Sequence, residues 1–393
     1  MCPLFSPPLF MQRYQFVVDF VQAHGSKKVL DLGCAECSLL KQLQYHGKGV
    51  ELLVGVDKDS SSMKTRMHSF APLSSDYLQP REGPLEIELY QGNVTQPDPI
   101  TRGFDLITCI ELIEHMQLED VERFSEVLFG FMAPSAVIVS TPNADYNPLL
   151  PGLVGFRHPD HKFEWSRQEF QLWAVRLSEL FGYSVSITGV GALDDAHTDV
   201  GFCSQIAVFN RKPSQNDPTN QHRSRGEPTV YRLLYSVAYP SLSDNNVLQR
   251  MLVNEVLSQA EQVKAAWLSG EWAAKMAGAR EPYRQGGDIC VSLLDVWACP
   301  QVKHLCGTLR RFTEALVGER RVPLTPDRQA VIVPTEEEDE EELDEEEEDE
   351  EEMAAVEARC TTTTTSVATE DWEEEITHSA VGELTACHVL AHD

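Results

Sequence analysis

The sequence predicts an α/β fold with a mainly parallel sheet of seven strands. Short apolar runs rich in valine, leucine and isoleucine alternate with segments whose apolar residues recur at helical spacing. Strands and helices that alternate in this way form βαβ units with parallel strands. Acidic residues end or follow three of the runs, at Asp31, Asp57 and Glu111. Because the carboxyl ends of parallel strands share one edge, the pattern indicates a polar site there.

Each expected strand corresponds to a short apolar run, and the helices correspond to segments between the runs. The strands are expected over residues 29–31, 52–56, 85–90, 104–110, 136–140, 185–190 and 202–209. Helices are expected over residues 11–24, 38–44 and 118–132. A further helix follows Ser166, because Ser166 and Glu169 have the spacing of a capping box, and it continues through Leu177.

Composition divides the chain into four parts. We expect an N-terminal helix that packs on the core (1–25), the α/β domain (26–211), a linker with a weakly patterned extension (212–322) and an acidic tail (323–393). The extension has the pattern of a strand over residues 229–239 and of a helix over residues 247–259. Disorder is expected for the tail, because apolar residues are scarce in it and carboxylates are concentrated in one run.

Charge and apolar content bound the class of protein. The formal net charge is −30, of which all but about −14 comes from the acidic run over residues 336–352. No cationic segment followed by an apolar one begins the sequence, and no apolar run is long enough to span a bilayer. The 10 cysteines are scattered along the chain rather than arranged in a framework. We therefore expect a soluble intracellular protein.

The residues after the first strand form a candidate cofactor loop. Asp31 precedes Gly33, and the loop opens a helix at Ser38, where backbone amides can approach a ligand. Asp57 lies 24 residues after Gly33, where a carboxylate can accept hydrogen bonds from ribose hydroxyls. A tight turn without a ligand is the alternative for the loop alone. The position of Asp57 favours a nucleoside-type cofactor.

The loop does not fit a nicotinamide dinucleotide. That fingerprint needs three glycines, where this chain has Gly33, Ala35 and Ser38. An acid two residues before the glycine, without a pyrophosphate cradle, instead resembles the Rossmann-like class I S-adenosylmethionine-dependent methyltransferases, although Ala35 replaces their usual glycine. We interpret Cys34 and Cys37 as small loop residues rather than as a redox pair or zinc ligands.

A second cluster of polar residues follows the fourth parallel strand. Glu111, Glu114 and His115 would share one face of a helical turn, if a turn begins at this point. His158 and His161 lie in a loop after the next strand and would emerge at the same sheet edge. Carboxylates and imidazoles together are metal ligands. The alternative is a solvated helix start whose glutamates complement the helix dipole.

Several short motifs identify a family that the chain resembles. They are PPL at residues 7–9 with QRY at 12–14, ELIEH at 111–115, STPN at 140–143 and DHKFEW at 160–165. In this order and at compatible spacing, they closely resemble the small-RNA 3′-terminal 2′-O-methyltransferases, the Hua-enhancer family. The resemblance covers roughly residues 6–211.

The resemblance implies a metal site in an enzyme that uses S-adenosylmethionine. The residues that match Glu111, Glu114, His115 and His161 hold a divalent cation in the family. His158 is not carried over, because the family motif centres on the second histidine of the loop. Magnesium is the cation that the family implies, whereas coordination chemistry alone would favour manganese or cobalt beside two imidazoles.

The resemblance also implies roles at the cofactor. Asp31 and Gly33 would belong to the cofactor loop, Asp57 would hold the cofactor ribose, and Asn93 would lie near the adenine. A cation bound beside the cofactor would lower the pKa of a ribose 2′-hydroxyl and align it with the methyl group for direct displacement. Either metal-bound histidine, or water, could then accept the proton.

The implied substrate is the 3′-terminal nucleotide of a small single-stranded RNA, whose end the methyl group would protect. Plant-type relatives carry additional RNA-binding domains that this chain has no room for. It therefore resembles the short animal type, which acts on piRNAs presented by a PIWI protein in cytoplasmic germ granules. Because the chain is acidic, contacts to RNA phosphates must be local, and Arg157, Lys162 and Arg167 flank the expected metal loop.

Two other functions stay open at this point. The first is a methyltransferase for a protein or small molecule. Base nitrogens are disfavoured as acceptors, because the Asn/Asp-Pro-Pro-Tyr pattern is missing after the fourth strand. The second is a non-catalytic scaffold that binds a PIWI partner and uses its acidic tail to recruit basic proteins. The expected metal ligands favour an enzyme with a diol acceptor, and a methyl-transfer assay separates the three.

Overall fold

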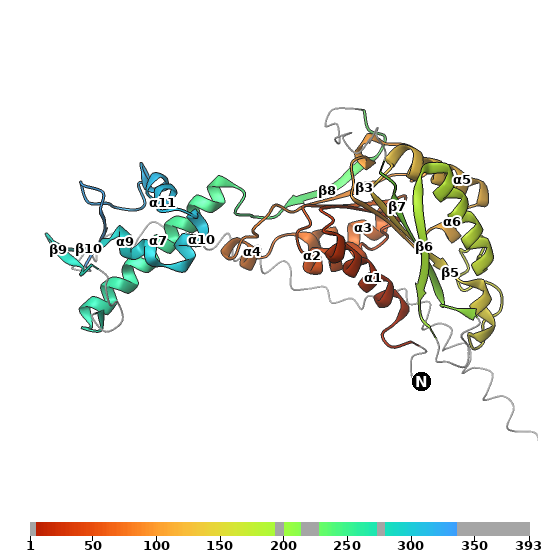
Figure 1. Ribbon diagram of the computed structural model, residues 1–393, viewed down its shortest axis with the longest axis horizontal. Helices are drawn as coiled ribbons and strands as arrows, with labels where there is room; N and C mark the ends of the chain where they lie inside the picture. Colours follow the sequence, from red (N-terminus) through yellow and green to blue (C-terminus); the bar gives the residue numbers. More distant parts are fainter. Residues whose placement is uncertain (1–4, 193–199, 214–227, 273–279, 336–393) are drawn as a thin grey trace, which may run out of the picture. The chain divides into compact units, whose positions relative to one another are not determined.

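The computed structural model describes residues 5–192, 200–213, 228–272 and 280–335 (Figure 1). These residues form two compact units, which divide between Ser241 and Leu242. Within the described residues, none of the helices is long and apolar enough to cross a membrane. The first unit contains every residue that the sequence nominates for the site.

The first unit is built on an eight-stranded sheet with the order β6-β7-β5-β4-β1-β2-β3-β8. Its strands are β1 (Lys28–Leu32), β2 (Leu52–Asp57), β3 (Glu86–Gln91), β4 (Leu106–Ile110), β5 (Ala136–Pro142), β6 (Tyr183–Val190), β7 (Ser204–Arg211) and β8 (Arg232–Ala238). The five central strands are parallel, and β7 and β8 pair antiparallel with β5 and β3. The expected α/β fold and mainly parallel sheet are confirmed.

The sequence predicted one strand too few and placed the end of the domain too early. Residues 229–239 have the predicted strand pattern, but they do not belong to a separate extension. Strand β8 pairs with β3 in the register Glu86↔Ala238 and Ile87↔Val237, and so becomes the eighth strand. The first unit therefore ends at Ser241 rather than at residue 211. The sequence predicted the earlier boundary because the linker after residue 211 is polar. The later strand pairs with β3 because the backbone groups at the edge of β3 would otherwise be unpaired.

Helices cover both faces of the sheet (Figure 1). They are α1 (Leu9–His24), α2 (Ser38–His46), α3 (Ser60–Arg66), α4 (Ser74–Leu78), α5 (Leu118–Ser125) with its π-helical continuation η4 (Glu126–Met132), and α6 (Arg167–Phe181). Successive residues of a strand point to opposite faces. In β1, Val29 therefore packs in the cluster that includes α1 and α2, and Leu30 packs in the cluster that includes α5 and α6.

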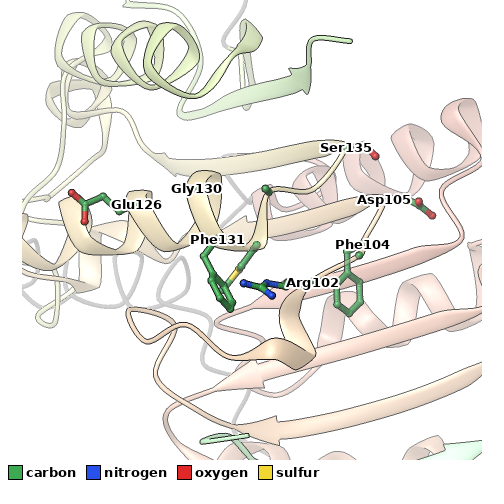
Figure 2. A pocket seen from close by; sticks show the side chains of 10 residues that line it. Arg102, Phe104, Asp105, Glu126, Gly130, Phe131 and Ser135 are labelled. Atoms are coloured by element: carbon green, nitrogen blue, oxygen red, sulfur yellow. The ribbon is translucent and has the colours of Figure 1, made fainter. Parts of the chain in front are cut away.

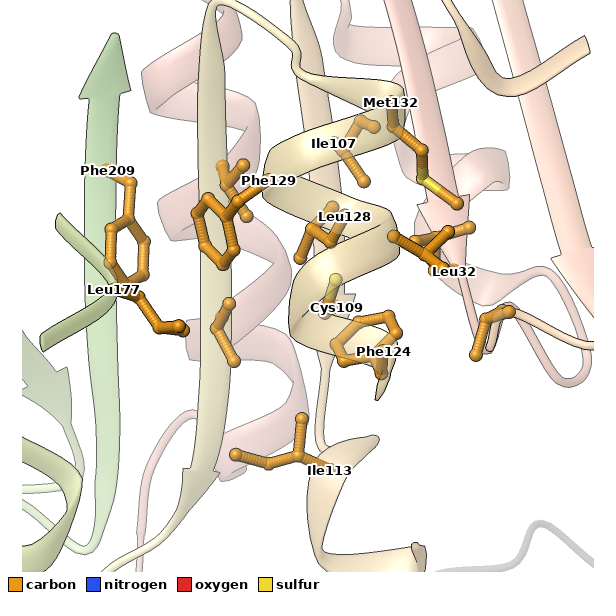
Figure 3. Close-up of a cluster of buried hydrophobic side chains, with 14 of the residues drawn as sticks. Leu32, Ile107, Cys109, Ile113, Phe124, Leu128, Phe129, Met132, Leu177 and Phe209 are labelled. Atoms are coloured by element: carbon orange, nitrogen blue, oxygen red, sulfur yellow. The ribbon is translucent and has the colours of Figure 1, made fainter. Parts of the chain in front are cut away.

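The core beneath α5 and α6 fixes the position of the turn that follows β4. Figure 3 shows Ile107 and Cys109 of β4 beside Phe124 and Leu128 of the overlying helix. Ile113, from the turn itself, is 0% exposed and belongs to the same cluster. Its burial removes apolar surface from water, a contribution of about 1.5–3 kcal/mol. The apolar residue of the turn therefore anchors the polar residues beside it.

The capping box predicted for α6 is present. Ser166 Oγ accepts a hydrogen bond from the Glu169 amide, and Glu169 Oε2 accepts one from the Ser166 amide at 2.9 Å. The two side chains satisfy amides that the first helical turn cannot pair. Helix α6 ends at Gly182, whose φ of 74° suits a residue without a Cβ.

The second unit has its own apolar core. It contains α7 (Asn245–Leu268), α9 (Leu293–Ala298), α10 (Pro300–Cys306) and α11 (Leu309–Leu316), with the strands β9 (Tyr283–Gln285), β10 (Asp288–Ser292) and β11 (Ala330–Val333). The expected helix over residues 247–259 is confirmed, within the longer α7. Because β11 pairs with β10, the ordered chain extends beyond the expected start of the tail at residue 323. The acidic run at 336–352 lies outside the described residues.

Candidate active site

Polar residues collect where the parallel strands end. Asp31 lies in β1, Asp57 ends β2, and Glu111 directly follows β4. Strands β2, β1 and β4 are neighbours, so their carboxyl ends bring the three acids to one edge of the sheet. Asn93 lies two residues beyond β3, which is the neighbour of β2. The sheet thus brings the predicted residues to the predicted edge.

The loop after β1 depends on residues with positive φ. Gly33 has a φ of 75°, and a Cβ built on it would lie 2.6 Å from Leu112 Cδ1. The conformation therefore favours glycine, and a Cβ would in addition displace the end of the Leu112 side chain. Ala35 adopts a φ of 42°, although it carries a Cβ. Asp57 stabilises this conformation, because its Oδ2 accepts a hydrogen bond from the Ala35 amide at 2.9 Å.

Cys34 and Cys37 are buried free thiols with their sulfur atoms 3.9 Å apart. The hydrogen bond with Cys37 and burial together raise the pKa of the Cys34 thiol well above its ordinary value. Thiols held in this neutral form react slowly. The geometry agrees with their interpretation as small residues that fill the inside of the loop.

Asp31 is a buried carboxylate that is only partly compensated. It is 4% exposed and accepts a hydrogen bond from Thr108 Oγ1 at 2.7 Å. Burial raises its pKa to about 7, the Thr108 hydrogen bond opposes the rise, and the charge of Asp57 adds to it. A cationic group placed against Asp31 would favour the ionised form. The chemistry suits an ammonium or sulfonium ligand.

Asn93 is exposed and forms a turn. Its Oδ1 accepts hydrogen bonds from the Thr95 amide at 3.1 Å and from Thr95 Oγ1 at 2.9 Å. The preceding Gly92 donates its amide to the backbone oxygen of Asp57 at 2.9 Å. The turn that contains Asn93 is therefore joined directly to the end of β2.

The residues after β4 do not share one helical face as expected. Only the short 3₁₀ turn η3 (Ile113–His115) is helical, and Glu111 precedes it with a φ of 50°. The Glu111 amide lies 3.1 Å from both the backbone oxygen and Oγ of Ser140, and this contact holds the chain in the left-handed conformation. Sequence spacing could not reveal this contact, because Ser140 belongs to the neighbouring strand β5.

The Glu111 carboxylate is held by three side chains. Its Oε1 accepts hydrogen bonds from Ser140 Oγ at 2.8 Å and Ser204 Oγ at 2.9 Å. Its Oε2 lies 3.6 Å from Arg13 Nη1, which α1 brings to the site. Arg13 is 5% exposed, and its Nε and Nη1 have no hydrogen-bond partner within the part of the chain that the structure describes. Sequence reasoning quoted Arg13 within a family motif but did not nominate it for the site.

Glu114 is the most deeply buried acid of the site. It is 0% exposed, and its Oε2 accepts a hydrogen bond from Thr141 Oγ1 at 3.0 Å. Its Oε1 has no hydrogen-bond partner among the described residues. Burial and the nearby charge of Glu111 raise the pKa of Glu114 well above its ordinary value. A buried carboxylate oxygen without a donor is an acceptor suited to a cation.

Three imidazoles form a cluster that contains His115, the residue after Glu114, and that includes neither the Glu111 nor the Glu114 carboxylate. One ligand atom from each of His115, His158 and His161 lies within 4.8 Å of the others. The rings of His115 and His161 have centroids 4.9 Å apart. Burial, followed by the neighbouring imidazoles, lowers the pKa of His115 to about 4, so this ring is neutral at pH 7. Neutral imidazoles are the form that binds metals. His158 joins the cluster, although the family motif did not point to it.

Glu164 orients His161. The Nδ1 atom of His161 lies 2.6 Å from Glu164 Oε1, and an ionised carboxylate can only accept this hydrogen bond. The ring proton is thereby placed on Nδ1, and Nε2 keeps its lone pair. Burial alone would raise the pKa of Glu164, but hydrogen bonds from His161, Asn147 and the Arg157 amide hold it below its ordinary value. Sequence reasoning missed this role, although the i, i+3 spacing within DHKFEW was a signal for it.

Arg157 does not have the expected role in phosphate binding. It is 5% exposed, and its Nη1 and Nη2 donate to the backbone oxygens of Cys203 at 2.9 Å and Asn143 at 2.6 Å. These bonds join the histidine loop to the residue after β5 and to the residue before β7, so Arg157 positions the loop. Lys162 is exposed, and its amide donates to the backbone oxygen of Glu114 at 2.7 Å. Arg167 is exposed and pairs with Asp145 at 3.2 Å.

A cavity of about 440 Å³ lies away from this cluster. Figure 2 shows Arg102, Phe104 and Asp105, which precede β4, together with Ser135, which precedes β5. The cavity is therefore at the amino-terminal edge of the sheet, opposite the edge that carries the acids and histidines. It does not contribute to the candidate active site.

Comparisons with known proteins agree with the geometry. A model described as a methyltransferase domain matches residues 11–192, and one described as the HENMT1 C-terminal domain matches residues 271–335. The small RNA 2′-O-methyltransferase of Gallus gallus is 41% identical over 362 residues, which are 84% of this chain and 95% of that protein. The protein of the same description from Mus musculus is 44% identical over 319 residues, which are 79% of this chain and 75% of that protein.

A solved structure extends the comparison to three dimensions. The crystal structure of small RNA methyltransferase HEN1 is 29% identical, with a TM-score of 0.50, and covers 60% of this chain and 28% of that chain. The relatives favour RNA over a protein or a small molecule as the acceptor. The chain belongs to the small RNA 2′-O-methyltransferase family and is an S-adenosylmethionine-dependent RNA methyltransferase.

Proposed function

We propose that this enzyme transfers a methyl group from S-adenosylmethionine to the 2′-hydroxyl of the 3′-terminal nucleotide of small single-stranded RNAs, and that the transfer requires a divalent cation. The observation that carries the metal dependence is the cluster of His115, His158 and His161, which follows a fully buried Glu114 whose Oε1 has no hydrogen-bond partner among the described residues. A terminal ribose is distinguished from internal riboses by its vicinal 2′ and 3′ hydroxyls. A cation can bind both oxygens, which gives a reason for terminal specificity.

The residues fit a cation. The resemblance implies Glu111, Glu114, His115 and His161 as ligands, and in this structure His115 and His161 cluster with His158 rather than with the two carboxylates. The Glu164 hydrogen bond leaves His161 Nε2 available as a ligand. A bound divalent cation would supply Lewis acidity that lowers the pKa of the 2′-hydroxyl. Magnesium follows from the family resemblance, whereas the imidazoles favour manganese or cobalt. The Ser140 and Ser204 hydroxyls hold Glu111 in place, so this carboxylate is oriented before any ligand arrives.

The cofactor would lie along the acidic sheet edge. Asp57 would accept hydrogen bonds from its ribose, Asn93 would lie near its adenine, and Asp31 would face its ammonium group. Gly33 would let the loop backbone approach. Arg13 supplies the opposite charge, because its buried Nε and Nη1 still need acceptors. The methionine carboxylate of the cofactor would provide an acceptor for one of them, since hydrogen bonds between a guanidinium and a carboxylate are among the stronger ones in proteins.

The proposed contact between Arg13 and the cofactor carboxylate can be tested with a cofactor analogue that lacks this carboxylate. Arg13→Gln should weaken binding of S-adenosylmethionine by about 10-fold or more. The same substitution should change binding of decarboxylated S-adenosylmethionine much less, because that compound lacks the acceptor. Calorimetric titration of both compounds provides the measurement, with the exposed Arg123→Gln as the control. Equal losses for the two compounds would contradict a contact between Arg13 and the carboxylate.

The substrate and its setting follow from the resemblance rather than from contacts. The proposed RNAs are piRNAs presented by a PIWI-type protein, in cytoplasmic germ granules. Lys162 is exposed beside the site and could contact a terminal phosphate. Binding of a PIWI protein to the purified chain, measured with and without bound RNA, tests the partner.

The central experiment compares RNA ends. With a divalent cation present, the purified protein should transfer labelled methyl groups to a single-stranded small RNA that ends in a 2′,3′-diol. An RNA that ends in a 2′-deoxynucleotide lacks the acceptor and should stay unlabelled. An RNA with a 3′-phosphate should be rejected, because one of the two hydroxyls is blocked. Equal labelling of the diol and deoxy ends would overturn the proposal.

A further inference from the structure

Residues 229–231, which lead into β8, are held by the buried carboxylate of Asp98, a residue that precedes the linker in the sequence. Asp98 is 0% exposed, and its Oδ2 accepts hydrogen bonds from Thr229 Oγ1 at 2.6 Å and from the amides of Val230 and Tyr231 at 2.7 and 2.8 Å. Its other oxygen accepts the Ile100 amide at 3.0 Å. Bonds to a carboxylate are among the stronger hydrogen bonds in proteins. The position of residues 229–231 is therefore well defined.

Tyr231 extends this contact to the turn that contains Asn93. Its hydroxyl lies 2.9 Å from the backbone oxygens of both Asn93 and Gln96, and it donates its one proton to this pair. Its ring covers Gly92 so closely that a Cβ on Gly92 would lie 2.5 Å from the ring. Tyr231 is 3% exposed. One side chain thus fixes the turn over residues 92–96 by both packing and hydrogen bonding.

The same turn is part of the sheet edge that carries Asp57. The Gly92 amide donates to the Asp57 backbone oxygen at 2.9 Å, and Gln91 Nε2 donates to the Lys58 backbone oxygen at 3.2 Å. Displacement of the turn would therefore move the backbone on which the Asp57 carboxylate is mounted. No residue beyond 211 was expected to affect this edge.

We infer that Tyr231 is a positioning residue for the cofactor. It holds the turn over residues 92–96 against Asp57, and so completes the adenosine end of the site from the far side of the linker. The inference rests on the proposed placement of the cofactor ribose at Asp57. Tyr231 need not contact the cofactor, because its hydroxyl acts on backbone oxygens of the turn. The segment after the linker thereby becomes part of the catalytic unit.

The experiment uses Tyr231→Phe in the full chain, which keeps the ring over Gly92 and removes only the hydroxyl. Loss of the hydrogen bond should weaken S-adenosylmethionine binding by about 3- to 10-fold, because the turn is less well held. The KM for the cofactor should rise by a similar factor. The turnover rate at saturating cofactor should stay within about twofold, since the metal cluster is not touched. Titration calorimetry and steady-state kinetics supply the two readouts.

Tyr239→Phe is the matched control. Tyr239 is also buried, and its hydroxyl accepts a hydrogen bond from Gln44 and donates one to the Phe70 backbone oxygen at 2.7 Å. It follows the last residue of β8, whereas Tyr231 precedes the first. Because β8 is antiparallel to β3, Tyr239 lies near the start of β3 and away from the turn over residues 92–96. Its loss should lower thermal stability without a change in cofactor affinity. A purely structural role for Tyr231 would instead give the two variants the same profile.

The outcomes separate this inference from the proposed function. If wild-type protein methylates the diol RNA while Tyr231→Phe binds the cofactor as tightly as wild type, the positioning role is wrong and the proposed function stands. If Tyr231→Phe and Tyr239→Phe weaken binding equally, the positioning role is also wrong. If wild-type protein labels diol and deoxy ends equally, the proposed function fails, whereas the affinity difference between the variants still tests the turn.

Discussion

At the scale of single residues, burial decides what each polar group of the site can do. Glu114 and Asp31 are both buried and have raised pKa values, but their surroundings differ. Glu114 lies next in the chain to His115 of the imidazole cluster, whereas Asp31 lies beside Thr108 in the strand before the loop over residues 33–37. The first environment suits a metal ion, and the second suits the positive end of a cofactor.

Replacement of Glu114 tests the metal cluster. Glu114→Gln should reduce methyl transfer by at least about 100-fold, because an amide is a poor ligand for a divalent cation. Cofactor affinity should change little, and thermal stability without metal should also change little, since the raised pKa of Glu114 favours its neutral form and an amide of the same shape replaces it. Turnover assays, cofactor titration and thermal unfolding supply the readouts, with the exposed Glu119→Gln as the control. Unchanged turnover at saturating metal would contradict a ligand role.

The pKa of Asp31 predicts the pH dependence of cofactor binding. The carboxyl group is mostly neutral below about pH 7 and ionised above it. An ionised carboxylate attracts an ammonium group, so the affinity for S-adenosylmethionine should rise as the pH increases from 5.5 toward 7.5, by about tenfold per unit at the acidic limit. Asp31→Asn should bind more weakly and lose this rise. A flat wild-type profile in calorimetry would show that Asp31 does not face the ammonium group.

At the scale of elements, local sequence patterns predicted the helices and strands whose conformation no tertiary contact changes. Helices α1 and α6 and strands β1 to β7 lie within a few residues of their predicted positions, because their apolar periodicity matches the face that they bury. The segment after β4 differs, since the Ser140 contacts hold Glu111 in a left-handed conformation that interrupts the helical spacing. A contact with a neighbouring strand outweighed the local pattern there.

The loop after β1 holds Ala35, a residue with a Cβ, in a left-handed conformation whose cost can be measured. Ala35 has a φ of 42°, in a region where a Cβ costs about 1–2 kcal/mol. Ala35→Gly should therefore raise the free energy of unfolding of the first unit, by about 0.5–1 kcal/mol after the greater freedom of glycine in the unfolded chain is subtracted. Ala71→Gly, at an exposed residue with a φ of −61°, should lower it. Urea unfolding of both variants checks the signs, and destabilisation by Ala35→Gly would contradict the strain.

At the scale of the whole molecule, the described residues form two compact units, whereas the sequence predicted one domain followed by a linker and a weakly patterned extension. The second unit has a buried core in which Val331 and Val333 of β11 are 0% and 3% exposed. The sequence missed this organisation because its elements are short, and glycines and prolines interrupt their periodicity. Only the pairing of β11 with β10 shows where the unit closes.

Two truncations test this boundary. Deletion of residues 336–393 should leave thermal stability and methyl transfer within about twofold of wild type, because every described strand and helix is kept. Deletion of residues 323–393 removes β11 and exposes the core of the second unit, so that unit should become sensitive to limited proteolysis. A large loss of turnover in the shorter deletion would show that the acidic tail contributes to catalysis. Equal protease resistance of the two proteins would place the boundary elsewhere.

The sequence by itself determined the α/β fold, the glycine-containing loop after β1 and the acidic residues that collect at the carboxyl edge of the sheet. These features depend on local periodicity, on the conformational freedom of Gly33 and on motif spacing. The tertiary structure alone decided that Arg13 approaches Glu111, that Glu164 orients His161, and that Tyr231 holds the turn beside Asp57. Arg13 and Tyr231 meet residues roughly 100 or more positions away in the sequence. Such contacts arise from the order of the strands and from the burial of polar groups that need partners, neither of which a local pattern specifies.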